Sequence, residues 1–162
     1  MRITVVAVGR ARSSAEQTIF DLHWERAAAS GGRLGFTKLD CVILDTSRSG
    51  DSAARMEDEA KKLIARIPPA AHRIALDEAG RSLSSEAFAK HLAALRDGGV
   101  RDLVFLIGGP DGLAPALREG ASERLAFGPQ TWPHLLVRAM LAEQIYRAFS
   151  ILSGHPYHRG RV

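Results

Sequence analysis

The chain has 162 residues, a mass of 17.5 kDa, 46% hydrophobic residues and a formal net charge of +4, with a pI of about 9.7. This size and composition predict a single domain over residues 1–162 with a core of its own. They exclude a membrane-spanning protein, because no apolar run approaches the roughly 18 residues that cross a bilayer, and the amino terminus lacks a signal-peptide pattern. We therefore expect a soluble, cytoplasmic protein.

Basic residues are concentrated near the carboxyl terminus. Residues 132–162 hold four arginines against one glutamate, a net charge of +3, and the preceding part of the chain carries +1. Such a cluster suits a polyanion such as nucleic acid. A charge excess that only increases solubility is the alternative.

Strand patterns and helix patterns alternate along the chain. Apolar runs with β-branched residues predict strands at residues 2–8, 38–45, 72–77, 102–107 and 123–127. The segments between and after them predict helices at about residues 14–29, 52–67, 85–97, 113–119 and 131–152. This order predicts an α/β fold, a three-layer sandwich with a mostly parallel sheet.

Cap residues set several helix boundaries. Gly31 and Gly32 are predicted to end the first helix, because glycine readily takes the backbone conformation that closes a helix. Thr131 is predicted to cap the last helix through its hydroxyl group, with Pro133 in the first turn, where its missing N–H is no loss.

The second helix and the segment before it are polar. Residues 46–51 are expected to form a mobile loop, because they are polar and contain glycine. Within the helix, the acidic residues 57–59 precede Lys61 and Lys62. This spacing predicts (i, i+4) ion pairs on a solvated face and no acidic site.

Three strand ends have the composition of binding loops. The strand at 102–107 ends in GGPDG at residues 108–112, where two glycines let a ligand approach the backbone closely. Residues 76–80 and 127–131 are similar turns after two other strands. Ligands of open α/β sheets lie beyond the carboxyl ends of strands, so these turns predict one pocket lined by backbone groups and suited to an adenine or ribose. Turns of this kind without any ligand are the alternative.

The familiar nucleotide motifs are missing. The sequence contains neither G-x-x-x-x-G-K-[ST] nor G-x-G-x-x-G, which disfavours kinases and dinucleotide-dependent dehydrogenases.

The tail segment GHPYHR at residues 154–159 combines two imidazoles, a phenol and a guanidinium. A metal site at His155 and His158 would need a third ligand that the sequence does not offer, so no metal is predicted. The alternative to a functional tail is a polar segment carried in solvent.

The last predicted helix has an apolar face wider than the stripe of a surface helix. Burial both on the sheet and against a second subunit would explain it, and a simple core helix would explain it equally well. His134, in its first turn, is either a polar group near the strand ends or a core histidine.

Four motifs in order carry a resemblance to a known family. They are FLIGGPDG at 105–112, TWPHLLVR at 131–138, EQIYRA at 143–148 and HPYHR at 155–159. Together they resemble the bacterial ribosomal RNA large-subunit methyltransferase H family, a minimal group of SPOUT methyltransferases. The resemblance implies methyl transfer from S-adenosylmethionine to N3 of a pseudouridine in 23S rRNA, with the assembled ribosome as substrate. It also implies a homodimer and a SPOUT-type trefoil knot at the carboxyl end.

The resemblance places the cofactor contacts on the same three strand ends. The residues are Leu76, Gly109, Gly128, Pro129, Gln130, Thr131, Trp132 and Pro133.

The chemistry needs a proton acceptor for an imide and donors that stabilise the resulting anion. Histidine titrates near neutrality, so His158 is the predicted proton acceptor. Tyr157 is predicted to orient or stack on the base, and Arg159 or Arg138 to stabilise the charge. Neither a metal nor a membrane partner is implied.

Two other classes of function remain in view. A non-catalytic ribosome- or RNA-binding protein on the same fold would keep the basic tail, but the glycines of the strand ends speak against it. A small-molecule enzyme on a doubly wound sheet is disfavoured by the basic tail and the missing nucleotide motifs.

Overall fold

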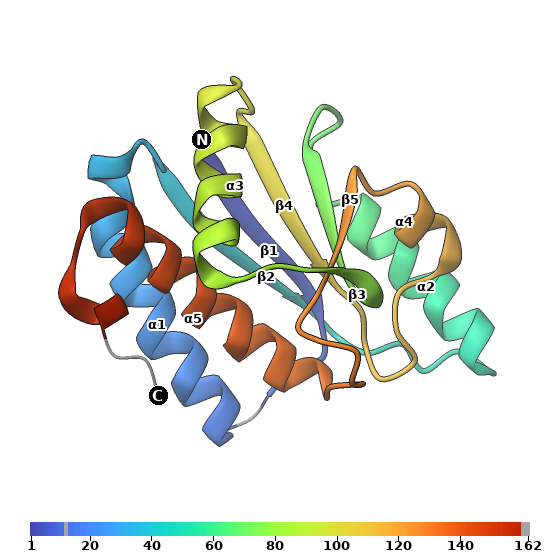
Figure 1. Cartoon of the computed structure of the whole chain (residues 1–162). Coiled ribbons are helices and arrows are strands. Elements are labelled where there is room, and N and C mark those ends of the chain that lie inside the picture. Colours follow the sequence, from blue (N-terminus) through green and yellow to red (C-terminus); the bar gives the residue numbers. More distant parts are fainter. Residues whose placement is uncertain (12, 160–162) are drawn as a thin grey trace.

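The computed structural model describes residues 1–11 and 13–159, and for His158 and Arg159 it describes the backbone alone. The described residues form a five-stranded sheet in the order β2-β1-β4-β3-β5, with all neighbouring strands parallel (Figure 1). The strands are β1 (Arg2–Val8), β2 (Lys38–Leu44), β3 (His72–Ser82), β4 (Asp102–Ile107) and β5 (Glu123–Ala126). The helices are α1 (Ala15–Gly31), α2 (Ser52–Ile64), α3 (Ser85–Asp97), α4 (Pro115–Glu119) and α5 (His134–Ser153), with 3-10 helices at Gly32–Leu34 and Pro156–Arg159.

The sheet is the middle of three layers, as predicted. In β1, Ile3 and Val5 face the core that is shared with α1, α3 and α5. The alternate residues Val6 and Val8 face the core shared with α2 and α4. Because successive side chains of a strand point to opposite faces, a strand buried on both faces needs consecutive apolar residues, and β1 has them at residues 5–8. Figure 1 shows β1 inside the sheet with helices on both sides.

Part of the wide apolar face of α5 is covered within the chain. Leu141, Ile145, Ala148 and Phe149 are fully buried in the core to which α1 and α3 also contribute. Leu135, Leu136 and Met140 of the same helix are only partly buried, so the burial of this face against a second subunit stays a prediction. Among the described residues, no helix has the length and apolarity needed to cross a membrane.

The α-helical part of the first helix ends at the predicted glycines, with Gly31 as its last residue and Gly32 as its C-cap residue, but not in the expected backbone conformation. The helix includes Gly31 and continues through Gly32, which keeps right-handed helical angles, into a 3-10 turn. The helical segment ends at Gly35, whose φ of 81° is left-handed. A glycine closes a helix only where the chain adopts that conformation.

Thr131 does not cap α5, which is a second correction. The residue before the helix is Pro133, and it makes no side-chain cap. The Thr131 hydroxyl donates instead to Glu78, which lies within β3. A tertiary partner has replaced the local bond that the sequence suggested.

β3 is longer than predicted. It runs through the expected turn to Ser82, and its pairing with β5 shifts register between Leu76 and Arg81. The residues between these two form an irregular stretch that leaves the ladder and reaches the edge where β4 and β5 end. The threading of the chain into a trefoil knot stays a prediction.

Candidate functional site

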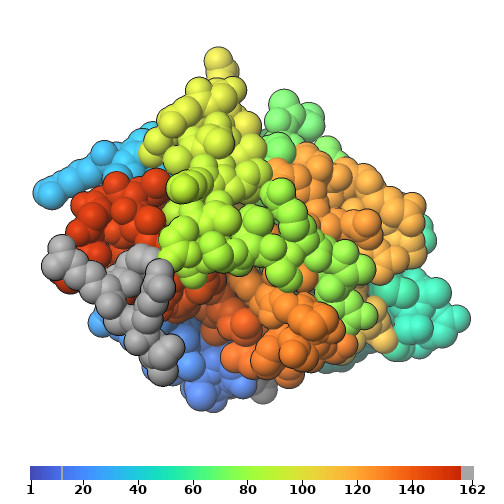
Figure 2. All heavy atoms as spheres, viewed as in Figure 1, coloured from blue at the N-terminus to red at the C-terminus, as the bar shows by residue number. Residues whose placement is uncertain are grey.

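A pocket of about 860 Å³ lies at the carboxyl ends of β4 and β5 and beside the irregular stretch of β3, where the strand was predicted to end. Its lining comes from residues 76–78, 107–113, 125–128 and 130–134, with contributions from α2, α4 and α5. Figure 2 shows the orange segment after β5 lying beside the green segment that follows β3. The prediction that the three strand ends meet in one pocket is confirmed.

Most of the predicted cofactor residues line this pocket. Leu76, Gly109, Gly128, Gln130, Thr131, Trp132 and Pro133 belong to its wall, and Pro129 does not. Their individual roles in binding stay predictions.

The glycine turn after β4 is closed by its own backbone. The Gly112 N–H donates to the Gly109 carbonyl oxygen at 2.9 Å, and Gly112 has a left-handed φ of 86°. A Cβ on Gly108 would lie 2.3 Å from the Gly112 carbonyl carbon. The missing side chain of Gly108 therefore makes room for the turn itself, and the close approach of a ligand to the two glycines stays a prediction.

The loop at residues 127–132, which follows β5, is held together by a hydrogen bond between two of its own residues. The Trp132 Nε1–H donates to the Phe127 carbonyl oxygen at 3.1 Å, which closes residues 127–132 into a compact loop. Gly128 has a φ of 101°, so a residue with a side chain would be strained there. The bond from Thr131 to Glu78 then joins this loop to the irregular stretch of β3 between Leu76 and Arg81.

The pocket wall is acidic. Among the described residues, three carboxylates line it, Asp77, Glu78 and Asp111, against one guanidinium, that of Arg118. Arg118 Nε lies 3.4 Å from Asp77 Oδ2. Asp111 accepts hydrogen bonds from Arg55, and these bonds hold the pKa of Asp111 below its usual value. Reasoning from strand ends did not assign a role to these charges, although Asp77, Glu78 and Asp111 stand in the segments it selected.

His134 lies at the pocket end of α5, beside β1. Its Nε2 is so close to Gly9 that a Cβ there would lie 2.3 Å from it. Burial, with a smaller effect from the positive charge of Arg138, lowers the pKa of His134. Of the two readings left open, the structure supports the polar group near the strand ends, since His134 lines the pocket.

The sequence profile described as "Predicted SPOUT methyltransferase" matches residues 1–158. Three curated relatives are named "Ribosomal RNA large subunit methyltransferase H". The relative from Phenylobacterium zucineum is 52% identical over 98% of this chain and 99% of its own length. The relative from Nitrobacter winogradskyi is 49% identical over 99% and 100%, and that from Bradyrhizobium diazoefficiens 48% identical over 98% and 99%. The chain belongs to the ribosomal RNA large subunit methyltransferase H family. Its membership of this SPOUT family agrees with the expected methyltransferase activity and with S-adenosylmethionine as the methyl donor.

The first of the predicted catalytic residues of this SPOUT methyltransferase, Arg138, is a buried side chain that links α5 to the end of β1 and to α1. It is 1% exposed and donates to the Gly9 carbonyl oxygen at 3.1 Å and to Gln17 Oε1 at 2.8 Å. Its guanidinium also lies 5.6 Å from the centre of the Phe20 ring. Arg138 does not belong to the pocket wall that the described residues form.

Tyr157 is docked on the middle of α5, also outside the pocket wall formed by the described residues. Its hydroxyl group donates to Glu143 Oε1 at 3.1 Å, and the Arg147 guanidinium lies 4.9 Å from its ring centre. The ring also packs on Tyr146 at 4.6 Å. The side chains of His158 and Arg159 lie outside the described residues. Among the side chains that are described, no three His, Cys, Asp or Glu residues are grouped as metal ligands would be.

The expected solvated face of α2 is only partly right. The pairs Glu57–Lys61 at 4.0 Å and Asp58–Lys62 at 2.6 Å are present, as predicted. Glu59, however, is 2% exposed. It lies under the glycine turn, where a Cβ on Gly109 would come within 3.0 Å of its Oε2. The sequence of acidic residues 57–59 alone could not show that Glu59 points into the protein while Glu57 and Asp58 pair with lysines.

Proposed function

We propose that this chain transfers a methyl group from S-adenosylmethionine to N3 of a pseudouridine in 23S rRNA, with the assembled ribosome as the acceptor. The observation that carries the proposal is the acidic pocket at three strand ends in a chain of this family. S-adenosylmethionine has a positive sulfonium centre, which carboxylates near it stabilise. Apolar groups such as Leu76 and Val137 give the same wall surfaces for an adenine.

The bound cofactor supplies an activated methyl group, so the chain has to align it and to manage one proton. Alignment of two bound reactants removes on the order of 7–11 kcal/mol of the barrier. His158 is the proposed acceptor of the N3 proton, Tyr157 stacks on the base, and Arg159 or Arg138 stabilises the anion that remains. His134 has a lowered pKa, so it is mostly in the neutral form that can accept a proton at neutral pH.

The complete site requires two subunits. Within one chain, Tyr157 is bonded to Glu143, which follows the pocket residue His134 by nine positions on α5. At a rise of about 1.5 Å per residue, this is about 14 Å along the helix axis. We propose that a homodimer brings the tail of one chain to the pocket of the other.

Titration calorimetry with S-adenosylmethionine tests the cofactor, and methylation of ribosomes with labelled cofactor tests the acceptor. We expect saturable binding and incorporation of label at a single pseudouridine, lost in His158→Ala without loss of cofactor affinity. Absence of binding at millimolar cofactor would leave the non-catalytic RNA-binding protein as the better description. Labelling of naked 23S rRNA as fast as ribosomes would remove the assembled ribosome as the acceptor.

A further inference from the structure

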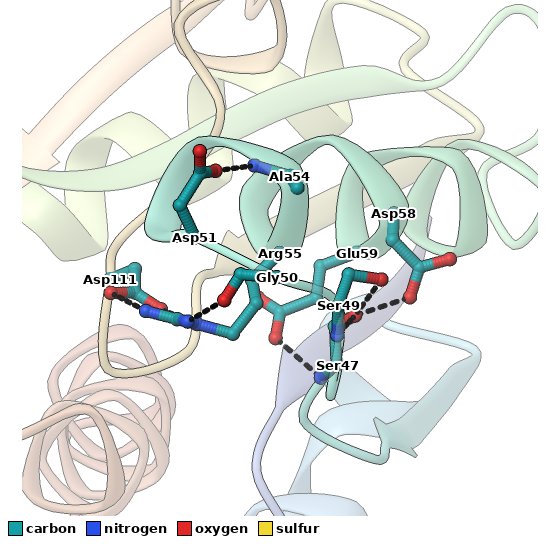
Figure 3. Close-up of polar contacts among 9 residues, drawn as sticks. All are labelled: Ser47, Ser49, Gly50, Asp51, Ala54, Arg55, Asp58, Glu59 and Asp111. Carbon is teal, nitrogen blue, oxygen red and sulfur yellow. Dashed lines mark hydrogen bonds and ion pairs between the residues drawn. The ribbon is translucent and has the colours of Figure 1, made fainter.

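Two side chains of α2 bond to the segment 47–50, and one of them also bonds to Asp111 in the glycine turn of the pocket (Figure 3). The first is Arg55. Its Nη1 donates to the Gly50 carbonyl oxygen at 2.9 Å. Its Nε and Nη2 donate to the two carboxylate oxygens of Asp111 at 2.7 and 3.0 Å. A planar guanidinium makes such a two-bond contact in one fixed orientation, so Arg55 restrains both segments at once.

The second is Glu59, one helical turn later. Its Oε1 accepts a hydrogen bond from the Ser47 N–H at 2.8 Å (Figure 3). Its Oε2 faces Gly109 and, among the described atoms, has no hydrogen-bond partner. A buried carboxylate oxygen without a partner costs stability.

The segment 47–50 is bound to α2 by further contacts, contrary to the mobile loop expected from its composition. Ser47 is 7% exposed, and its Oγ bonds to Asp58 at 2.6 Å and to Ser49 Oγ at 3.1 Å. No residue of this segment belongs to the pocket wall formed by the described residues. A change in the pocket can therefore reach it through the two side chains Arg55 and Glu59, which we call the α2 clasp.

We propose that Arg55 and Glu59 are positioning residues that couple the segment 47–50 to the glycine turn, so that a methyl donor held on Gly109 and an ordered segment 47–50 stabilise each other. This inference rests on the proposed function of the pocket. The coupling is reciprocal, because a change in affinity at one place must appear at the other. Neither residue touches reacting atoms, so the clasp changes the affinity for the cofactor and not the methyl transfer step.

Amide hydrogen exchange tests the coupling directly. In the full-length protein, saturating S-adenosylmethionine should slow exchange at residues 47–50 by about tenfold, although the pocket wall does not include them. In Arg55→Lys, which keeps the charge but loses the two-bond contact, this protection should largely disappear. Glu59→Gln, a second and nearly isosteric variant, should reduce it as well. Glu57→Gln on the exposed face of the same helix is the matched control and should keep full protection.

Kinetics give an independent reading. Arg55→Lys and Glu59→Gln should each raise KM for the cofactor by about tenfold while kcat at saturating cofactor stays near that of the parent. The double variant should lose less than the product of the two single effects, because both residues act on the same turn. Thermal unfolding without cofactor separates these effects from a loss of folded protein.

The outcomes distinguish this inference from the function on which it rests. If the parent protein does not bind S-adenosylmethionine, the proposed function fails and the coupling fails with it. If it binds the cofactor but residues 47–50 gain no protection, the coupling alone is wrong. A fall in kcat with unchanged KM in both variants would also overturn it.

Discussion

At the scale of single residues, the turn at residues 108–112 shows what a side chain would contact at each of its first two glycines. A Cβ on Gly108 would meet the Gly112 carbonyl carbon at 2.3 Å and the Leu113 nitrogen at 2.6 Å. Both are backbone atoms, which cannot move without opening the turn. At Gly109 the nearest groups are side chains, Glu59 and Val8, each at 3.0 Å. The two positions therefore differ in what a methyl group would disturb.

Gly108→Ala should destabilise the protein by about 1–3 kcal/mol, the usual range for overpacking a filled site, and should weaken cofactor binding because the turn is displaced. Denaturant unfolding and titration calorimetry measure the two effects. Gly32→Ala is the control, since nothing lies within 4 Å of its added Cβ and its backbone is helical. Unchanged stability of Gly108→Ala would show that the turn can open without loss.

His134 gives the fold a dependence on pH. Its folded-state pKa is lowered from 6.5 by burial, so the unfolded chain binds more protons than the folded one as the pH falls through that value. Stability should therefore decrease as the pH is lowered below about 6.5. His134→Gln should flatten this dependence, as measured by the midpoint of thermal unfolding between about pH 5 and pH 7.5. An identical slope in the variant would assign the effect to other groups, such as His23, whose pKa burial also lowers.

At the scale of elements, Arg138 joins α5 to the end of β1 and to α1. Lysine cannot reach both Gly9 and Gln17 with its single nitrogen, so Arg138→Lys should cost about 1–3 kcal/mol of stability. If the residue only links these elements, kcat should change little at a temperature where the variant stays folded. A large fall in kcat with unchanged stability would instead support its predicted role in stabilising the anion.

The sequence predicted best the strands that are buried in the core on both faces. β1 and β4 have the predicted bounds, because a continuous apolar run ends where burial ends. At three helix starts the sequence offered two neighbouring cap residues each, Ser13 or Ser14, Asp51 or Ser52, and Ser84 or Ser85. The structure uses Ser14, Asp51 and Ser84, whose side chains bond locally to the first turn. Thr131 and Glu59 were misjudged since their partners are distant in the sequence. The same reasoning found the pocket through its three strand ends but missed the α2 clasp, which belongs to no strand end.

At the scale of the whole molecule, the tail and the pocket are separated along α5. A mixed dimer should reveal whether two chains complete one site. One chain would carry Gly108→Ala in the pocket, and the other His158→Ala in the tail. Such a dimer should recover up to about half of the parent activity, because one of its two sites combines an intact pocket with an intact tail. Each homodimeric variant should be much less active than the mixed dimer at limiting cofactor, and no recovery in the mixture would place pocket and tail in the same chain.

The pocket also lies beside an edge of the sheet, the one formed by β5. β5 is an edge strand of four residues, and its pairing with β3 is interrupted by a register shift. Short edges of this kind open locally at a smaller free-energy cost than the central strands do. A ligand that contacts β3, β4 and β5 together would hold β5 against its neighbours and raise the free-energy cost of its local opening. Resistance of residues 120–130 to proteolysis would then report how much of the protein is loaded with cofactor.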